Sequence, residues 1–171
     1  MDGYLDELAA RTPTPGGGGA AAVTGAMAAG LVAMAARFSV GRLPGALDLA
    51  EQADELRRRA TGLAEADAAA YTAVLDARRP GGDLRSALYG AAVVPLEIAE
   101  IGARVAQMAA QVASAGNPNL RGDAVTGMLL AAASARSAAC LVDINVGLGG
   151  LEPELSRRAT QARRFLRVDG F

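Results

Sequence analysis

The sequence predicts an all-α fold, an alanine-rich multihelical bundle. Aromatic residues make up only 4% of the chain, alternating apolar and polar runs typical of strands are missing, and apolar residues recur at helical spacing. At 171 residues the chain has the length of a single domain, residues 1–171, with one hydrophobic core. Helices this rich in alanine form thin layers, so we expect two subunits to share a core as a homodimer.

The first predicted helix is short, over Tyr4–Arg11, and the segment Thr12–Gly19 after it contains two prolines and four glycines. A second helix follows the glycines and ends near Ser39. Its large apolar residues lie at helical spacing, which predicts a core-facing stripe: Val23, Met27, Leu31, Met34 and Phe38. Its other faces are mainly Ala and Gly, which let helices approach closely. We therefore expect this helix at the centre of the bundle.

The third and fourth predicted helices span Ala46–Arg78 and Leu84–Ala115, separated by the break "RRPGGD". Asp67 lies on the apolar stripe of the third helix, where an ionised carboxylate is costly unless it is paired or has a function. An ion pair with an arginine of another helix and a role in a site remain equal alternatives. Pro95 lies inside the fourth helix and predicts a kink or two abutting helices.

The fifth predicted helix covers Asp123–Gly147, and between residues 124 and 142 its only charged residue is Arg136. We therefore expect it to be buried on nearly all sides, with Cys140 as a small buried hydrophobic residue. The sixth, over Pro153–Val168, is rich in arginine, and we expect a solvated arginine face.

The charge composition argues against nucleic acid and membrane partners. The chain has 17 basic residues, all Arg, and 18 acidic residues, for a net charge of −1. The uncharged segment Thr12–Ala36 is mostly small residues, which favours a buried helix over a membrane span. No secretory signal pattern is present near the first residues, and the single cysteine fits a cytoplasmic protein.

The absence of histidine limits the chemistry. Proton transfer must use Asp, Glu, Tyr, Cys or water, and we expect no metal. The glycine run lacks the patterns of dinucleotide-binding and P-loop sites. It either offers backbone N–H groups to a ligand or serves as a flexible entry to a tightly packed helix. Asp123 suits either a helix N-cap or a ligand contact. Arg42 suits either an anion partner or the helix dipole.

Three blocks together resemble the cyclodeaminase/cyclohydrolase family in order and spacing, from Leu8 to Leu151. They are "TPTPGGGGAAAVTGAMAAGLVAMAARFSVGR", "LAEADAAAYTAV" and "GNPNLRGDAVTGMLLAAASARSAACLVDIN". The family includes the cyclodeaminase domain of formiminotransferase-cyclodeaminase and bacterial methenyl-tetrahydrofolate cyclohydrolases. The resemblance implies an intertwined homodimer that binds a tetrahydrofolate derivative as its substrate. It also favours a ligand-facing role for the glycine run.

The resemblance implies two catalytic carboxylates. Asp123 would stabilise a cationic one-carbon unit and relay a proton, and Asp67 would assist or hold the pterin. Arg42 would face the anionic glutamate tail of the folate. The implied substrate-binding residues are Pro15, Gly16, Gly17, Gly18, Arg42, Tyr71, Asn117 and Asn145.

The resemblance implies an enzyme that hydrolyses methenyl-tetrahydrofolate to formyl-tetrahydrofolate, or cyclises formimino-tetrahydrofolate with release of ammonia. Three positions depart from the family pattern. Arg42 stands where Lys is frequent, Gly122 where Ser or Thr is usual, and Leu141 where Asn is usual. The alternative is therefore a catalytically impaired folate-binding or helical interaction dimer.

Overall fold

The computed structural model describes residues 2–164, and this part of the chain is helical without strands. The all-α prediction is therefore confirmed. The end of the sixth predicted helix, at Val168, lies outside the described residues. The elements are α1 (Asp2–Ala9), α2 (Gly17–Arg37), α3 (Ala46–Ala77), α4 (Leu84–Ala115), a 3₁₀ turn η1 (Pro118–Leu120), α5 (Arg121–Gly149) and α6 (Glu154–Arg164).

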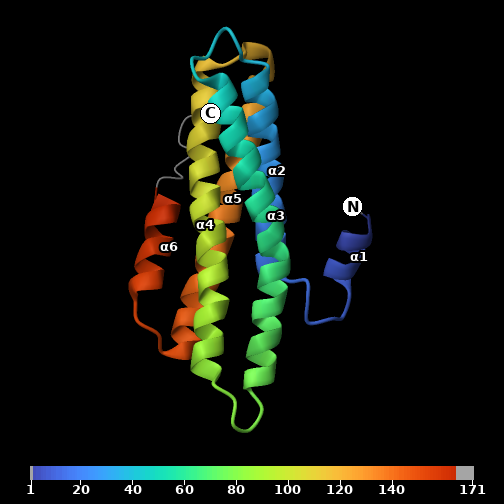
Figure 1. Cartoon of the computed structure of the whole chain (residues 1–171), viewed down its shortest axis with the longest axis vertical. Helices are drawn as coiled ribbons and strands as arrows, with labels where there is room; N and C mark the ends of the chain where they lie inside the picture. Colours follow the sequence, from blue (N-terminus) through green and yellow to red (C-terminus); the bar gives the residue numbers. More distant parts are fainter. Residues whose placement is uncertain (1, 165–171) are drawn as a thin grey trace.

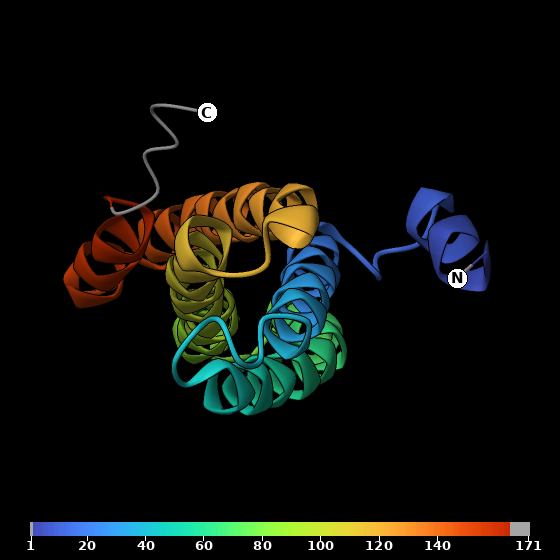
Figure 2. The same cartoon turned by 90° about the horizontal axis from the view of Figure 1, so that it is seen from above.

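Helices α2 to α5 form an elongated antiparallel bundle (Figure 1). Seen along its axis, α2 lies between α3 and α5, and α4 completes the ring (Figure 2). Helix α6 packs on the outside of α4 and α5, whereas α1 stands apart beyond α2 in both views. Helix α2 starts beside the second half of α3, so its first turn lies near Asp67 rather than at an end of that helix (Figure 1).

The predicted stripe of α2 does not form its buried face. Val23, Leu31 and Met34 are only half-buried, Met27 is 45% exposed, and Phe38, just after the helix, is 62% exposed. Most of the Ala and Gly residues of α2 are buried instead. A Cβ at Gly25 would lie 2.9 Å from Ser134 Oγ, and that hydroxyl donates to the carbonyl of Ala21 at 2.7 Å. Close approach to α5 therefore requires the small face. The predicted central position of α2 is confirmed, because it packs against α3, α4 and α5.

Helix α4 is a single element that continues through Pro95, so the alternative of two abutting helices is wrong. Pro95 lies in the core, where the largest fully buried side chains also include Leu96 and Ile98. A Cβ at Gly102 would lie 2.9 Å from the carbonyl oxygen of Ala131, which shows how closely α4 and α5 approach. The core is thus built from close backbone approach as much as from large side chains.

Helix α5 is not buried on nearly all sides, contrary to the prediction. Leu129 is 48%, Ile144 55% and Leu148 65% exposed, and Cys140 is exposed rather than buried. These residues follow one helical face that the described chain leaves uncovered. Three segments, α2, α4 and η1–α5, are long and apolar enough to cross a membrane by length and composition, and about half of each packs inside the bundle.

Candidate functional site

The first turn of α2 is capped by a carboxylate from another helix. The N-cap residue Gly16 provides no side-chain hydrogen bond, and the N–H of Gly19 donates to Asp67 Oδ2 of α3 at 3.1 Å. A Cβ at Gly18 would overlap the Asp67 carboxylate, whereas Gly17 has open space around it. At Gly18 the glycine run therefore makes room for Asp67.

The Asp67 carboxylate is half-buried without an ion pair among residues 2–164, so the ion-pair interpretation is wrong. Burial raises the pKa of Asp67, and the hydrogen bond from Gly19 partly opposes that rise. A carboxylate with a raised pKa is a better proton acceptor near neutral pH than an exposed one. The N–H groups of Gly17 and Gly18, in the first helical turn, have no acceptor within the helix.

Tyr4 of α1 reaches the same place, although the sequence patterns gave no reason to select it. Its hydroxyl oxygen lies 3.4 Å from the position that a Cβ of Gly19 would occupy. The hydroxyl is fully buried and has no hydrogen-bond partner in the described part of the chain. Burial raises the pKa of Tyr4, and the nearby charge of Asp67 raises it further.

Two further predicted residues flank this region. Tyr71 follows Asp67 by one helical turn on α3 and is 45% exposed. Pro15 is half-buried and directly precedes the glycines. The structure thus brings five of the predicted residues close to Asp67: Pro15, Gly16, Gly17, Gly18 and Tyr71.

The opposite end of α2 holds Asn117 in a different setting. Ser39 Oγ donates to the Ala35 carbonyl at 2.7 Å and accepts from the Asn117 backbone N–H at 2.9 Å. The Asn117 side chain donates to the Phe38 carbonyl at 3.1 Å and accepts from the backbone N–H of Asn119 at 3.0 Å. Both amide atoms of Asn117 therefore hold the α4–α5 turn against the end of α2.

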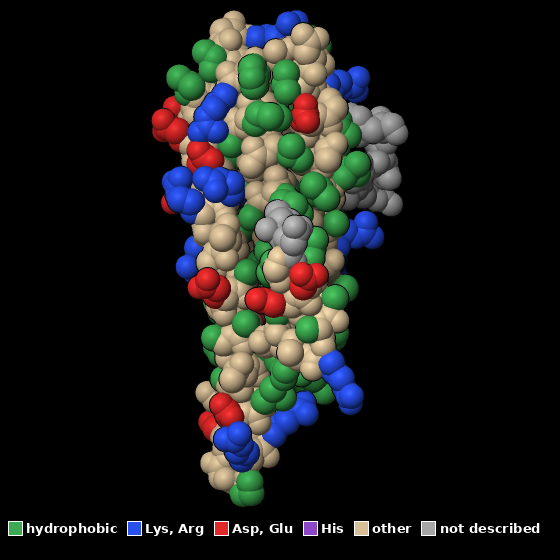
Figure 3. Space-filling model, turned by 90° about the vertical axis from the view of Figure 1, so that its right-hand side faces the viewer, with side chains coloured by type: hydrophobic (Ala, Val, Ile, Leu, Met, Phe, Trp, Pro, Cys, Tyr) green, Lys and Arg blue, Asp and Glu red, His purple; other side chains and the backbone are tan. Residues whose placement is uncertain are grey.

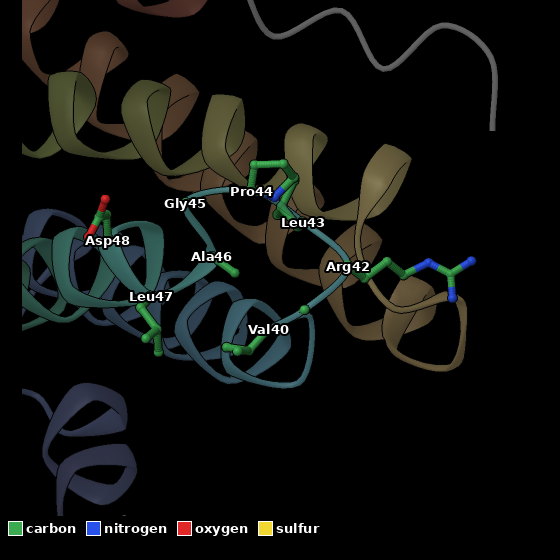
Figure 4. Close-up of a pocket in the computed structure, with 9 residues that line it drawn as sticks. Val40, Arg42, Leu43, Pro44, Gly45, Ala46, Leu47 and Asp48 are labelled. Atoms are coloured by element: carbon green, nitrogen blue, oxygen red, sulfur yellow. The ribbon is translucent and has the colours of Figure 1, made fainter.

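Arg42 and Asp123 lie at this same end of the bundle. Arg42 is exposed in the α2–α3 connection, which lines a surface pocket of ≈ 440 Å³. Its guanidinium points away from the other labelled lining residues (Figure 4). Asp123 lies in the first turn of α5, whose N-cap is Leu120, so the predicted N-cap role of Asp123 is wrong.

Asn145 belongs to neither group. Its amide donates to the Ala91 carbonyl of α4 at 2.7 Å, far down α5 from Asp123. The amide of Asn145 therefore ties α5 to α4 in the lower part of the bundle.

A single chain does not bring the two candidate catalytic carboxylates together. Asp67 contacts Gly19 near the start of α2, whereas Asn117 and the start of α5 lie beyond its last turn. The rise of an α-helix puts the two ends of α2 about 30 Å apart. Both residues stay predictions as catalytic groups.

Among residues 2–164 no group of three or more Asp, Glu or Cys side chains could hold a metal ion. The expectation of a metal-free site stays a prediction. The polar groups that the structure offers near Asp67 are a carboxylate, a phenol and backbone N–H groups, which suit an organic ligand with hydrogen-bonding edges.

Comparisons with known proteins point to one family. The model of the formiminotransferase-cyclodeaminase family matches residues 1–149. A methenyltetrahydrofolate cyclohydrolase of Methylorubrum extorquens is 36% identical over 162 residues, which cover 85% of this chain and 78% of the relative. The crystal structure of a formiminotetrahydrofolate cyclodeaminase from Thermotoga maritima matches with a TM-score of 0.85 at 29% identity. That match covers 97% of this chain and 87% of the other.

The matches extend over α1 to α5, and so include the glycine run, Asp67, Asp123 and Asn145. The likeness in sequence and in fold agrees with the resemblance found from the three sequence blocks. The chain belongs to the formiminotransferase-cyclodeaminase family.

Proposed function

We propose that this protein is an enzyme of tetrahydrofolate one-carbon chemistry. It hydrolyses methenyl-tetrahydrofolate to formyl-tetrahydrofolate, or cyclises formimino-tetrahydrofolate with release of ammonia. The observation that carries the proposal is the half-buried Asp67 carboxylate at the glycine-rich start of α2. The names of the matched relatives support the same chemistry.

In the hydrolytic direction, water adds to the methenyl carbon and gives one proton to the Asp67 carboxylate. The raised pKa of Asp67 suits it to accept this proton. One carbon–nitrogen bond then breaks, the leaving nitrogen takes the proton from Asp67, and the hydroxyl proton passes to solvent as the formyl group forms. A second carboxylate, Asp123, stabilises the cationic substrate by its charge.

In the cyclodeaminase direction the free folate nitrogen attacks the formimino carbon and gives its proton to the Asp67 carboxylate. The former imino nitrogen takes up that proton and one more from solvent, and leaves as ammonia as the methenyl cation forms. The Asp67 and Asp123 carboxylates can act in this direction too, because both reactions pass through a tetrahedral carbon between two nitrogens. The backbone N–H groups of Gly17 and Gly18 are available to an acceptor edge of the pterin. Arg42 would pair with a glutamate carboxylate of the folate.

The separation of the two carboxylates is explained if the enzyme is an intertwined homodimer. Helix α5 exposes an apolar face with Leu129, Ile144 and Leu148, and α1 stands away from its own bundle. The side that carries α1 displays hydrophobic side chains over much of its upper half (Figure 3). A twofold axis would let Asp123 of the partner subunit meet Asp67 of the first, in two equivalent sites.

A second candidate is a folate-binding dimer with little or no turnover. The observation that favours it is the engagement of both the Asn117 and Asn145 amides within the protein. Arg42, Gly122 and Leu141 also depart from the family pattern. In either case the partner is a small folate rather than nucleic acid or a membrane, and the location that suits it is the cytoplasm.

The activity test follows the loss of methenyl-tetrahydrofolate absorbance with purified full-length protein. We expect a rate above buffer, and a fall of at least about a hundredfold in Asp123→Ala and in Asp67→Asn. Turnover of formimino-tetrahydrofolate, detected as ammonia, separates the two reactions. Binding of folates by calorimetry without turnover supports the binding dimer, and absence of both rejects the folate function.

The shared-site arrangement has a test of its own. Asp123→Ala and Asp67→Asn chains are each inactive, but unfolding and refolding them together gives mixed dimers with one intact site. Random pairing then restores about a quarter of wild-type activity. Each variant refolded alone is the control. If the mixture stays inactive while forming mixed dimers, the two carboxylates do not combine across subunits.

A further inference from the structure

We propose that Tyr4 is a substrate-contacting residue, whose buried hydroxyl donates a hydrogen bond to an acceptor atom of the folate bound against Asp67. The inference rests on the proposed function, because it takes the Asp67 region as the folate site. It adds a side chain from α1, which none of the sequence patterns assigned to the site.

Three helices meet at the Tyr4 hydroxyl. A Cβ on Gly19 of α2 would have as its nearest neighbours Tyr4 Oη at 3.4 Å and the Ala64 carbonyl of α3 at 3.7 Å. The same Gly19 gives its N–H to Asp67. The phenol of Tyr4 therefore ends beside the helix start and the carboxylate that the proposed reaction uses.

The Tyr4 hydroxyl has no hydrogen-bond acceptor among residues 2–164. The oxygen of Tyr4 is buried and makes no hydrogen bond with the described residues, although Ala64 and Asp67 both offer acceptors nearby. Of the buried side-chain polar atoms in this part of the structure, it alone is unsatisfied. Buried polar groups nearly always have a partner, so an unsatisfied one at a candidate site indicates where a ligand supplies the bond.

The protonation state of Tyr4 suits a donor. Burial and the neighbouring Asp67 charge both raise the pKa of the phenol, which keeps its proton in place at neutral pH. The acceptors available on a folate are the oxygen and nitrogen atoms of the pterin and of its one-carbon unit. The neutral phenol can therefore hold such an atom beside Asp67 without adding a second negative charge.

The alternative role for Tyr4 is an anchor that holds α1 against the bundle. Helix α1 otherwise stands apart, with Leu5 53% exposed (Figures 1 and 2). The two roles predict different effects on the stability of the ligand-free protein when the hydroxyl alone is removed. An anchor through the hydroxyl would lose a bond, whereas a ligand contact loses nothing in the free protein, because the hydroxyl is unpaired there.

The experiment compares Tyr4→Phe with the matched control Tyr89→Phe in the full-length protein. Tyr89 lies on α4 and is 54% exposed. We measure kcat/KM for methenyl-tetrahydrofolate, the affinity for a non-reactive reduced folate by calorimetry, and the Tm without ligand. In Tyr4→Phe we expect kcat/KM and affinity to fall about five- to tenfold, with the Tm unchanged or higher. Tyr89→Phe should match the wild type.

The inference is overturned if Tyr4→Phe keeps kcat/KM and affinity within about twofold of the wild type. It is also overturned if the Tm of Tyr4→Phe falls, because the hydroxyl then anchors α1. If the wild-type protein neither binds nor converts folates, both the proposed function and the role of Tyr4 are rejected. A wild type that is active, with Tyr4→Phe equal to Tyr89→Phe, rejects the role of Tyr4 alone.

Discussion

The two ends of α2 are held by different kinds of interaction. At its start, a half-buried carboxylate from α3 accepts one backbone N–H, and the neighbouring Tyr4 hydroxyl has no partner. At its end, Ser39 and Asn117 form neutral hydrogen bonds in which the donors and acceptors are matched. Partial burial of the charged Asp67 side chain therefore costs folding free energy at the start of α2, whereas the hydrogen bonds at its end involve no charged group.

This difference suggests a functional role for Asp67 and a stabilising role for the Ser39–Asn117 hydrogen bonds. A raised pKa at Asp67 means that folding disfavours its charged form, which a purely structural cap would avoid. The hydrogen bonds of the Ser39–Asn117 cluster involve no titratable group and close the turn between α4 and α5. We therefore assign the proposed proton transfer to Asp67 at the start of α2, and a stabilising role to the Ser39–Asn117 hydrogen bonds at its end.

The largest effect is expected for Gly18→Ala. The new Cβ would overlap the Asp67 carboxylate and force it away from the N–H of Gly19. Activity should fall by about 10²–10⁴-fold, the range for loss of an acid–base group, and the Tm should fall as well. The control is Gly90→Ala on α4, where a Cβ also has open space and where activity and Tm should both be kept. Equal activity in the two variants would contradict the close approach.

Asp67→Asn should lose a similar amount of activity but keep the fold. The amide oxygen can still accept from Gly19, and the neutral side chain avoids burying a charge. Because the pKa of Asp67 is raised above 3.8 in the folded protein, its favourable contribution is present below that pH and lost as pH rises through the raised value.

The Asn variant should therefore match the wild type in Tm at low pH and equal or exceed it at neutral pH. Thermal unfolding at a series of pH values measures the difference. A variant that is less stable than the wild type at neutral pH would show that the charged form of Asp67 supports the fold.

Ser39→Ala tests the other end and should affect stability rather than chemistry. It removes the partner of the partly buried Asn117 N–H, at a cost of about 1–3 kcal/mol. Urea unfolding measures this cost, and kcat/KM well below the Tm should change far less than in Asp67→Asn. The control is Ser114→Ala, since Ser114 is exposed and bonds only the Gln111 carbonyl. Similar losses in the two serine variants would contradict a special role for Ser39.

Arg37→Ala should have the smallest effect. Arg37 and Arg57 both bond Asp54 near the surface and hold its pKa below 3.8. The contribution of these bonds is present above that pH and lost as pH falls through the lowered pKa. We expect less than about 1 kcal/mol at neutral pH, with no change in activity. A larger loss in urea unfolding would show that this pair fixes α2 against α3.

Helix limits followed closely from local pattern, because proline, glycine and apolar spacing act within a few residues. The predicted third and fourth helices differ from α3 and α4 by at most one residue at an end. The buried faces were harder to predict. Size alone pointed to Met27 and Phe38 as core on α2, whereas the close approach of α5 at Gly25 selects the small face instead.

Some residues of the candidate site could likewise be identified from the sequence, and others could not. Asp67 and the glycine run could be selected from sequence, because a carboxylate on an apolar stripe and four glycines are visible in the residues themselves. Tyr4 could not be selected, since an aromatic residue in a short amphipathic helix gives no signal before tertiary contacts are known. The N-cap expectation for Asp123 failed because Pro118 opens a 3₁₀ turn that starts the helix two residues earlier.

An alanine-rich helical bundle, the position of each long helix and a family resemblance that the comparisons confirm could all be predicted from the sequence. These depend on local periodicity and on residue types at fixed spacing. The tertiary structure was needed to show that Asp67 caps α2, that Gly18 makes room for it, and that Asp123 belongs to the opposite end of α2, whose two ends are about 30 Å apart. Such contacts join helices distant in sequence, and they are set by how closely the backbones pack.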